Sequence, residues 1–149
     1  MKKLLSVLCG AVMAFSAVTC SAAVSSDKIA PGGVRPGMTA SEVVRIAGQP
    51  ASKSHDGEKW FYKDFVVEFD DDSNTVEEIS TKSNGVVTPN NIAVGQNERV
   101  LSNTYGAADK VKQKHNYVTY IYLSTNYRQK LEFTVANGVI VEIECTTED

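Results

Sequence analysis

Apolar and polar residues alternate with different periods along the chain, and each change of period marks an expected element. Thr39 is followed by Glu42 and by apolar residues at helical spacing, which predicts a helix with a capping box. Gly48 and Pro50 mark the end of this helix. Period-two alternation next predicts three strands, at residues 59–63, 65–70 and 75–81. The first half of the chain is therefore expected to form a helix followed by a three-stranded antiparallel meander.

The second half of the chain carries the same order of patterns. Asn97 is expected to cap a second short helix, which ends at Gly106. Three more strands are expected at residues 117–123, 129–135 and 138–145. Aligning the two halves sets Trp60 against Val118. Together the patterns predict an α+β fold of two tandem repeats, αβββ twice, with the helices on one face of the sheet.

The remaining segments complete the expected domain organisation. Residues 24–35 contain Pro31-Gly32-Gly33 and are expected to form a flexible lead, and Asn84-Gly85 indicates a linker between the repeats. The expected divisions are a signal peptide at 1–23, the lead at 24–35, the first repeat at 36–82, the linker at 83–91 and the second repeat at 92–149.

The N-terminal residues have the composition of a secretory signal peptide. Two lysines form the charged start, an apolar stretch follows over residues 4–18, and Ala23 ends a run of small residues. The apolar stretch is shorter than the roughly 20 residues that cross a bilayer. We therefore expect cleavage near Ala23 and a mature chain in the periplasm or outside the cell. Cys20 leaves an alternative, lipidation and anchoring to the outer membrane, although Thr19 fits poorly before a lipidated cysteine.

The net charge and the number of cysteines indicate which partners are expected and whether a disulfide can stabilise the fold. Two of the 15 basic residues leave with the signal peptide, so 13 remain against 18 acidic residues and the mature net charge is about −5. Nucleic acid is therefore not an expected partner. Cys145 is the one cysteine expected after cleavage, so we predict no internal disulfide and interpret it as a strand residue.

The sequence shows no convincing catalytic motif. It lacks a glycine-rich phosphate loop, a Cys-x-x-Cys pair and a serine in a nucleophile elbow. His55 and His115 fall in polar runs, and we interpret them as loop residues rather than metal ligands. The aspartates at 70–72 lack the glycine and the distal glutamate of a calcium loop, which favours a solvated hairpin. We expect no enzymatic activity, no cofactor and no metal.

Several short motifs are similar to those of one known fold family. Gly37-Met38-Thr39 opens a helix that ends in Ala47-Gly48-Gln49-Pro50, and Trp60-x-Tyr62 and an apolar strand follow. Each half thereby resembles the family that contains the outer-membrane assembly lipoproteins of the SmpA/OmlA (BamE) type and the repeats of β-lactamase inhibitory protein. The resemblance implies an exported, non-enzymatic module that binds a partner protein through a sheet face. Two alternatives stay open, a BamE-like accessory lipoprotein of the outer membrane and a structural envelope protein of unknown role.

Strand alternation indicates which side chains leave the core. Trp60 and Phe61 must face opposite sides of their strand, and Trp60 is expected to be the one beneath the helix. The expected partner-binding residues on the other face and in the longer loop are Phe61, Tyr117, Thr119, Ile121, Tyr127 and Arg128. We expect a monomer that binds a protein partner and that meets a membrane only if Cys20 is lipidated.

Overall fold

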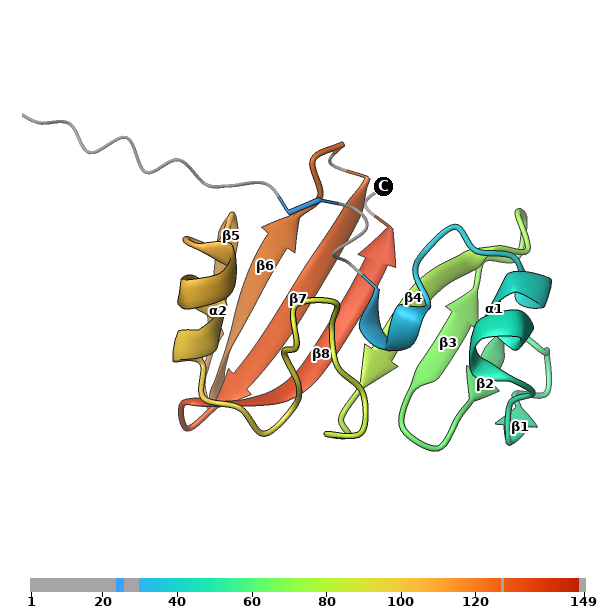
Figure 1. Cartoon of the computed structure of the whole chain (residues 1–149), viewed down its shortest axis with the longest axis horizontal. Helices are drawn as coiled ribbons and strands as arrows, with labels where there is room; N and C mark the ends of the chain where they lie inside the picture. Colours follow the sequence, from blue (N-terminus) through green and yellow to red (C-terminus); the bar gives the residue numbers. More distant parts are fainter. Residues whose placement is uncertain (1–23, 26–29, 127, 148–149) are drawn as a thin grey trace, which may run out of the picture.

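The described part of the chain forms a single antiparallel sheet of eight strands, in the order β1-β2-β3-β4-β8-β7-β6-β5 (Figure 1). The computed structural model describes residues 24–25, 30–126 and 128–147; the expected signal peptide with Cys20, and Tyr127, lie outside them. The strands are β1 (Ser52–Lys53), β2 (Lys59–Phe61), β3 (Val66–Phe69), β4 (Val76–Thr81), β5 (Lys110–Lys114), β6 (Tyr117–Leu123), β7 (Gln129–Ala136) and β8 (Val139–Thr147).

The two halves of the sheet meet where their last strands pair. β4 and β8 run antiparallel, with Ile79 opposite Cys145 and Ser80 opposite Glu144. Strands β3, β2 and β1 extend the sheet on one side of this join, and β7, β6 and β5 extend it on the other. The join makes the sheet continuous between residues that are far apart in the sequence.

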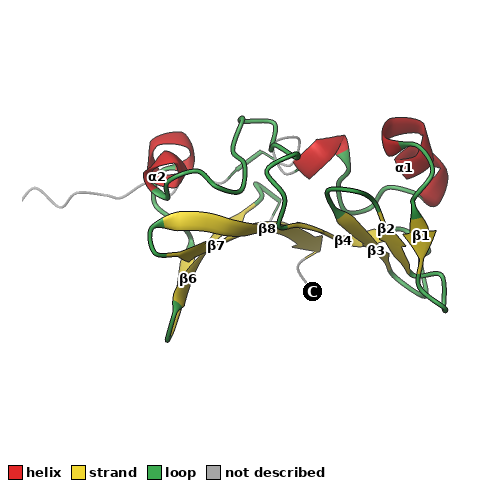
Figure 2. Ribbon diagram, turned by 90° about the horizontal axis from the view of Figure 1, so that it is seen from below, coloured by secondary structure: helices red, strands yellow, loops and turns green. Residues whose placement is uncertain are grey.

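Both α-helices are short and lie on the same side of the sheet as a 3₁₀ turn (Figure 2). α1 (Ala40–Ala47) begins at the expected N-cap, where Thr39 and Glu42 form the capping box. Gly48 ends α1 with a φ of 79°, a left-handed conformation that favours glycine. α2 (Arg99–Tyr105) ends at Gly106 in the same way, and the 3₁₀ turn η2 (Pro31–Gly33) precedes α1.

The fold class expected from the sequence, α+β with an αβββ unit in each half, is wrong. The molecule is mostly one eight-stranded sheet, and the α-helices within the described residues have only eight and seven residues. They bury few side chains, Val43 in α1 and Leu101 with Tyr105 in α2, so they do not form a helical layer over the sheet. The pattern also missed β1 and β5, because every residue of these edge strands is exposed and their polar composition gives no apolar alternation.

Irregular segments between the helices supply much of the burial that longer helices would otherwise provide. Val34 is fully buried, and Val86 and Ile92 are nearly so. A backbone hydrogen bond of 3.2 Å from Gly32 N–H to the Val87 carbonyl joins the segment before α1 to the segment after β4. The expectation of a flexible lead over residues 24–35 is therefore wrong for its described C-terminal part, because apolar side chains there complete the core.

The hydrophobic core lies on the helix side of the sheet. Trp60 belongs to it and is 7% exposed, whereas Phe61 at the next position is 37% exposed. The Trp60 ring lies 4.7 Å from the ring of Phe69, and its Nε1–H donates to the Gly57 carbonyl at 3.0 Å. The prediction that Trp60 anchors the core while Phe61 faces away from it is confirmed.

Candidate functional site

The sheet face turned away from the helices, here called the open face, carries the side chains that leave the core. Figure 2 shows α1, α2 and the 3₁₀ turn on the other side of the sheet. One row of side chains crosses the open face from β2 to β6: Phe61, Val66, Ser80, Glu144, Glu132 and Ile121. The open face therefore continues across both halves of the molecule, because each residue of this row pairs with the next one on the neighbouring strand.

The structure places most of the expected contact residues on or beside the open face, but it does not gather them. Phe61 and Tyr117 lie on this face and are 37% and 39% exposed. Thr119 lies there as well and is half-buried, and Arg128 is exposed in the connection between β6 and β7. Four strands separate β2 from β6, so the two aromatic rings do not form one patch.

Ile121 is the exception among the expected contact residues. It lies on the open face but is only 2% exposed, so its selection as a surface residue was wrong. Its neighbours across the register are Lys110 and Glu132, whose aliphatic stems are long enough to cover it. Strand alternation predicts the side on which a residue lies, but not how far longer neighbours cover it.

Glutamates gather in the middle of the open face, around the join between β4 and β8. Glu68 lies opposite Glu78 on β3 and β4, and Glu132 lies opposite Glu144 on β7 and β8. Glu142 shares this face because it stands two residues before Glu144 in the same strand. We call these five glutamates the acidic seam.

Lysines neutralise the outer members of the acidic seam. The Lys59 amine lies 2.8 Å from Glu68, and the Lys130 amine lies 3.4 Å from Glu132. A third pair, Lys82 with Glu142, is also separated by 3.4 Å. Within the described residues, the two central members, Glu78 and Glu144, form no ion pair within 4.0 Å. The centre of the seam therefore keeps an excess of carboxylates.

Burial, and then the neighbouring carboxylates, raise the pKa values of the two central glutamates. Burial raises the pKa of Glu144 to about 7, with further contributions from the charges of Glu78, Glu132 and Glu142. Burial, followed by the charge of Glu68, also raises the pKa of Glu78. Glu144 therefore gains and loses its proton near neutral pH, whereas an isolated glutamate would stay ionised there.

A buried hydroxyl without a partner stands beside these carboxylates. Thr146 lies on the same face as Glu144, and its register neighbours are Glu78 on β4 and Lys130 on β7. It is 9% exposed, and its Oγ1 has no hydrogen-bond partner among the described residues. Buried hydroxyls are normally hydrogen-bonded, so this one is an unused donor and acceptor at the centre of the open face.

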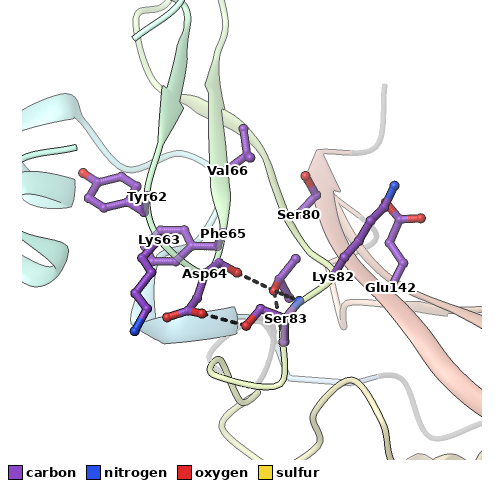
Figure 3. Close-up of a pocket in the computed structure, with 10 residues that line it drawn as sticks. Tyr62, Lys63, Asp64, Phe65, Val66, Ser80, Lys82, Ser83 and Glu142 are labelled. Carbon is purple, nitrogen blue, oxygen red and sulfur yellow. Dashed lines mark hydrogen bonds and ion pairs between the residues drawn. The ribbon is translucent and has the colours of Figure 1, made fainter. Parts of the chain in front are cut away.

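A hollow of about 400 Å³ opens beside the turn between β2 and β3 and reaches the seam at Glu142 (Figure 3). The rings of Tyr62 and Phe65 stack on one side, with centroids 4.5 Å apart. The Ser83 hydroxyl donates to Asp64 Oδ1 at 2.7 Å. The residues that line the hollow include no histidine and no cysteine.

The residues weighed for chemistry from the sequence occupy separate places. His55 and His115 are exposed in the turns before β2 and β6. Cys145 is fully buried in β8, and burial raises the pKa of its thiol, which disfavours the reactive thiolate. Within residues 24–25, 30–126 and 128–147, no three His, Cys, Asp or Glu side chains form a group able to hold a metal ion. No helix in these ranges has the length and apolar character needed to cross a membrane.

Sequence reasoning missed the acidic seam, although part of its signal was present. Alternation within the middle strands already turned Glu68 and Glu132 away from the core. The missing fact was that β4 and β8 are neighbours, which brings Glu78 and Glu144 together. Such long-range pairing of two strands leaves no local mark in the sequence.

Comparisons with known proteins support the fold only. No protein-family model matches the chain, and no curated protein matches it. Among solved structures, the chain is similar to a DUF4309 family protein (YjgB) from Bacillus subtilis, with 16% identity and a TM-score of 0.55 over 77% of this chain and 82% of that one. An extracellular protein containing a SCP domain from Bacillus anthracis aligns with 11% identity and a TM-score of 0.46, over 91% of this chain and 50% of that one.

Proposed function

We propose that this chain is an exported, non-enzymatic module that binds a partner protein through the open face of its sheet. The observation that supports this most directly is the open face itself, a single register of side chains across both halves of the molecule. Because the core is built on the helix side, the packing of the core does not require aromatic rings on the open face. Phe61 and Tyr117 nevertheless stand exposed there, and such rings are enriched at protein interfaces.

Binding also agrees better than catalysis with where the reactive groups lie. The Cys145 thiol has no exposed surface, so a substrate has no access to it in the folded chain. His55 and His115 stand in turns that precede different strands in different halves of the sheet. A binding role is instead supported by the exposed rings of Phe61 and Tyr117 on the open face.

Site-specific crosslinking tests the proposal. A photocrosslinking amino acid is introduced in place of Thr119 on the open face and, as a matched control, in place of Ser102, which is exposed on α2. Irradiation of cell-envelope fractions is expected to trap a protein at position 119 and not at position 102. Trapping only from α2, or from neither position, would contradict an open-face interface.

The identity of the trapped protein separates the roles implied by the family resemblance. Capture of a protease or a β-lactamase favours an inhibitor, whereas capture of barrel-assembly components favours the BamE-like accessory role. The export and processing of the chain are tested in the same cells, by locating the protein after fractionation and by comparing its mass with that of the chain cleaved near Ala23.

A further inference from the structure

Resting on the proposed function, we propose that the acidic seam is the docking site for a basic segment of the partner protein, which presents lysine or arginine side chains to Glu78 and Glu144. The choice of partner follows from the chemistry of the open face. The seam contains five glutamates, and three lysines form ion pairs with its outer members. An added cation at the centre would relieve repulsion between carboxylates, whereas an acidic or purely apolar segment would not.

Thr146 gives an independent reason to expect a ligand at this place. Its hydroxyl is buried between Glu78 and Lys130 in the register and has no hydrogen-bond partner within the described residues. An unsatisfied buried polar group costs free energy in the isolated protein. The Thr146 oxygen is itself buried, so an ammonium or guanidinium group at Glu78 donates to it only after displacing a side chain that covers it.

The neighbours of Glu144 make this docking dependent on pH. The groups that face it are Ser80 and Glu78 on β4, Lys130 and Glu132 on β7, and Glu142 on its own strand. Glu144 is partly protonated near pH 7 because burial and the neighbouring glutamates raise its pKa. A bound cation favours the ionised form, so binding should expel a proton and should strengthen as the pH rises from about 6 to 8.

The proposal is tested with a labelled oligolysine peptide and the purified protein. Fluorescence anisotropy is expected to show binding that strengthens from about pH 6 to 8. Titration calorimetry in buffers of different ionisation enthalpy should show the release of a fraction of a proton per peptide at pH 7, since the pKa of Glu144 is raised to about 7. Glu144→Gln should weaken binding by roughly three- to tenfold and abolish the proton release.

Two further variants separate docking at the seam from general attraction to an acidic protein. Asp72→Asn removes the same charge from the exposed hairpin between β3 and β4, and it should leave both the affinity and the proton release almost unchanged. Thr146→Val removes the unpartnered hydroxyl. It should raise the melting temperature of the free protein while weakening peptide binding, a combination that loss of folding cannot produce.

The outcomes also separate this inference from the proposed function. Equal losses for Asp72→Asn and Glu144→Gln, or no proton release, would overturn docking at the seam. Binding of calcium alone, or self-association through the Lys110, Lys112 and Lys114 edge of a second copy, would overturn the choice of partner. If crosslinking at position 119 still traps a protein whose binding is insensitive to Glu144→Gln, the proposed function stands and this inference fails.

Discussion

The two halves of the sheet are built from the same order of elements but are stabilised differently. In the first half the strands β1 to β4 have two to six residues, and Trp60 with Phe69 forms the aromatic contact of the core. In the second half the strands β5 to β8 have five to nine residues, and three rings, Tyr105, Tyr122 and Phe133, pack together. The half with the shorter strands is also the half whose helix, α1, begins with a capping box.

Matching hydrogen bonds show where the halves correspond. The Tyr62 hydroxyl donates to the Gly48 carbonyl at the end of α1, and the Tyr122 hydroxyl donates to the Gly106 carbonyl at the end of α2. Tyr122 is thus the counterpart of Tyr62 in the second half. The halves differ in the length of their strands and in the aromatic residues of their cores. They are nevertheless joined in one sheet by the pairing of β4 with β8.

The largest expected effect tests whether the halves unfold together. Trp60→Ala in the first half and Phe133→Ala in the second should each lower the free energy of unfolding by about 3–5 kcal/mol, because both rings are enclosed. Urea unfolding followed by circular dichroism should show one shifted transition in each case. Phe61→Ala, on the exposed face of the same strand as Trp60, serves as the control and should cost far less. Two separate transitions would show that the halves are independent.

The pH dependence of stability tests the join itself. Folded Glu144 keeps its proton up to about pH 7, whereas an unfolded glutamate loses it at about pH 4.3. The folded state thus binds the extra proton between these values, so stability should fall as the pH rises through this window. After allowance for solvent screening, we expect a loss of about 1–2 kcal/mol from pH 5 to 8, measured by urea unfolding. Glu144→Gln should flatten this profile; an unchanged slope would place the titration elsewhere.

The helix caps offer a smaller contrast between the halves. Thr39 Oγ1 accepts a hydrogen bond from Glu42 N–H, and Glu42 Oε2 accepts one from Thr39 N–H at 2.8 Å. The expectation that Asn97 caps α2 is wrong, because the N-cap is Glu98 and its side chain makes no capping bond. Asn97 Oδ1 only accepts a hydrogen bond of 3.0 Å from Arg99 N–H. Thr39→Ala should therefore cost about 1 kcal/mol and Asn97→Ala about half as much, as measured by thermal unfolding. A larger loss for Asn97→Ala would reverse the assignment of the stronger cap to the first half.

The smallest expected effect on stability concerns the edge strand β5. Its lysines at positions 110, 112 and 114 are exposed and stand at the free edge of the sheet. Replacing Lys112 and Lys114 with Thr, while keeping Lys110 because its stem covers Ile121, should change the free energy of unfolding by no more than about 0.5 kcal/mol. It should nevertheless promote aggregation, because charged edges prevent strand addition. Light scattering during storage measures this, and β1, with two residues, offers too short an edge for a comparable effect.

Local signals allowed much of the second-half sheet to be predicted. The strand at Tyr117–Leu123 was predicted with the bounds it has, because its alternation is regular and turn residues flank it. The α1 cap was predicted because Thr39 and Glu42 have the required spacing. The alignment of Trp60 with Val118 was wrong by two residues, because the matching Tyr62 and Tyr122 contacts are tertiary and the loop lengths differ.

The candidate site was less predictable than the strands, because it depends on contacts between residues that are far apart in the sequence. Alternation identified the open face and the exposure of Phe61 and Tyr117. It failed for Ile121, whose burial depends on side chains of the neighbouring strands, and it missed the acidic seam. Both depend on which strands lie side by side, and for β4 and β8 this is set by contacts between the halves.

The pairing of β4 with β8 also has a consequence for the order of folding. The hairpins within each half connect strands that follow one another in the chain, so closing them restricts only short loops. Pairing Ile79 with Cys145 instead closes a loop that contains α2, β5, β6, β7 and most of β8. Loop-closure entropy opposes such a contact, and the crowded carboxylates at the join add repulsion when they are ionised. Folding should accordingly be faster in mildly acidic solution, with assembly of the halves as the slow step.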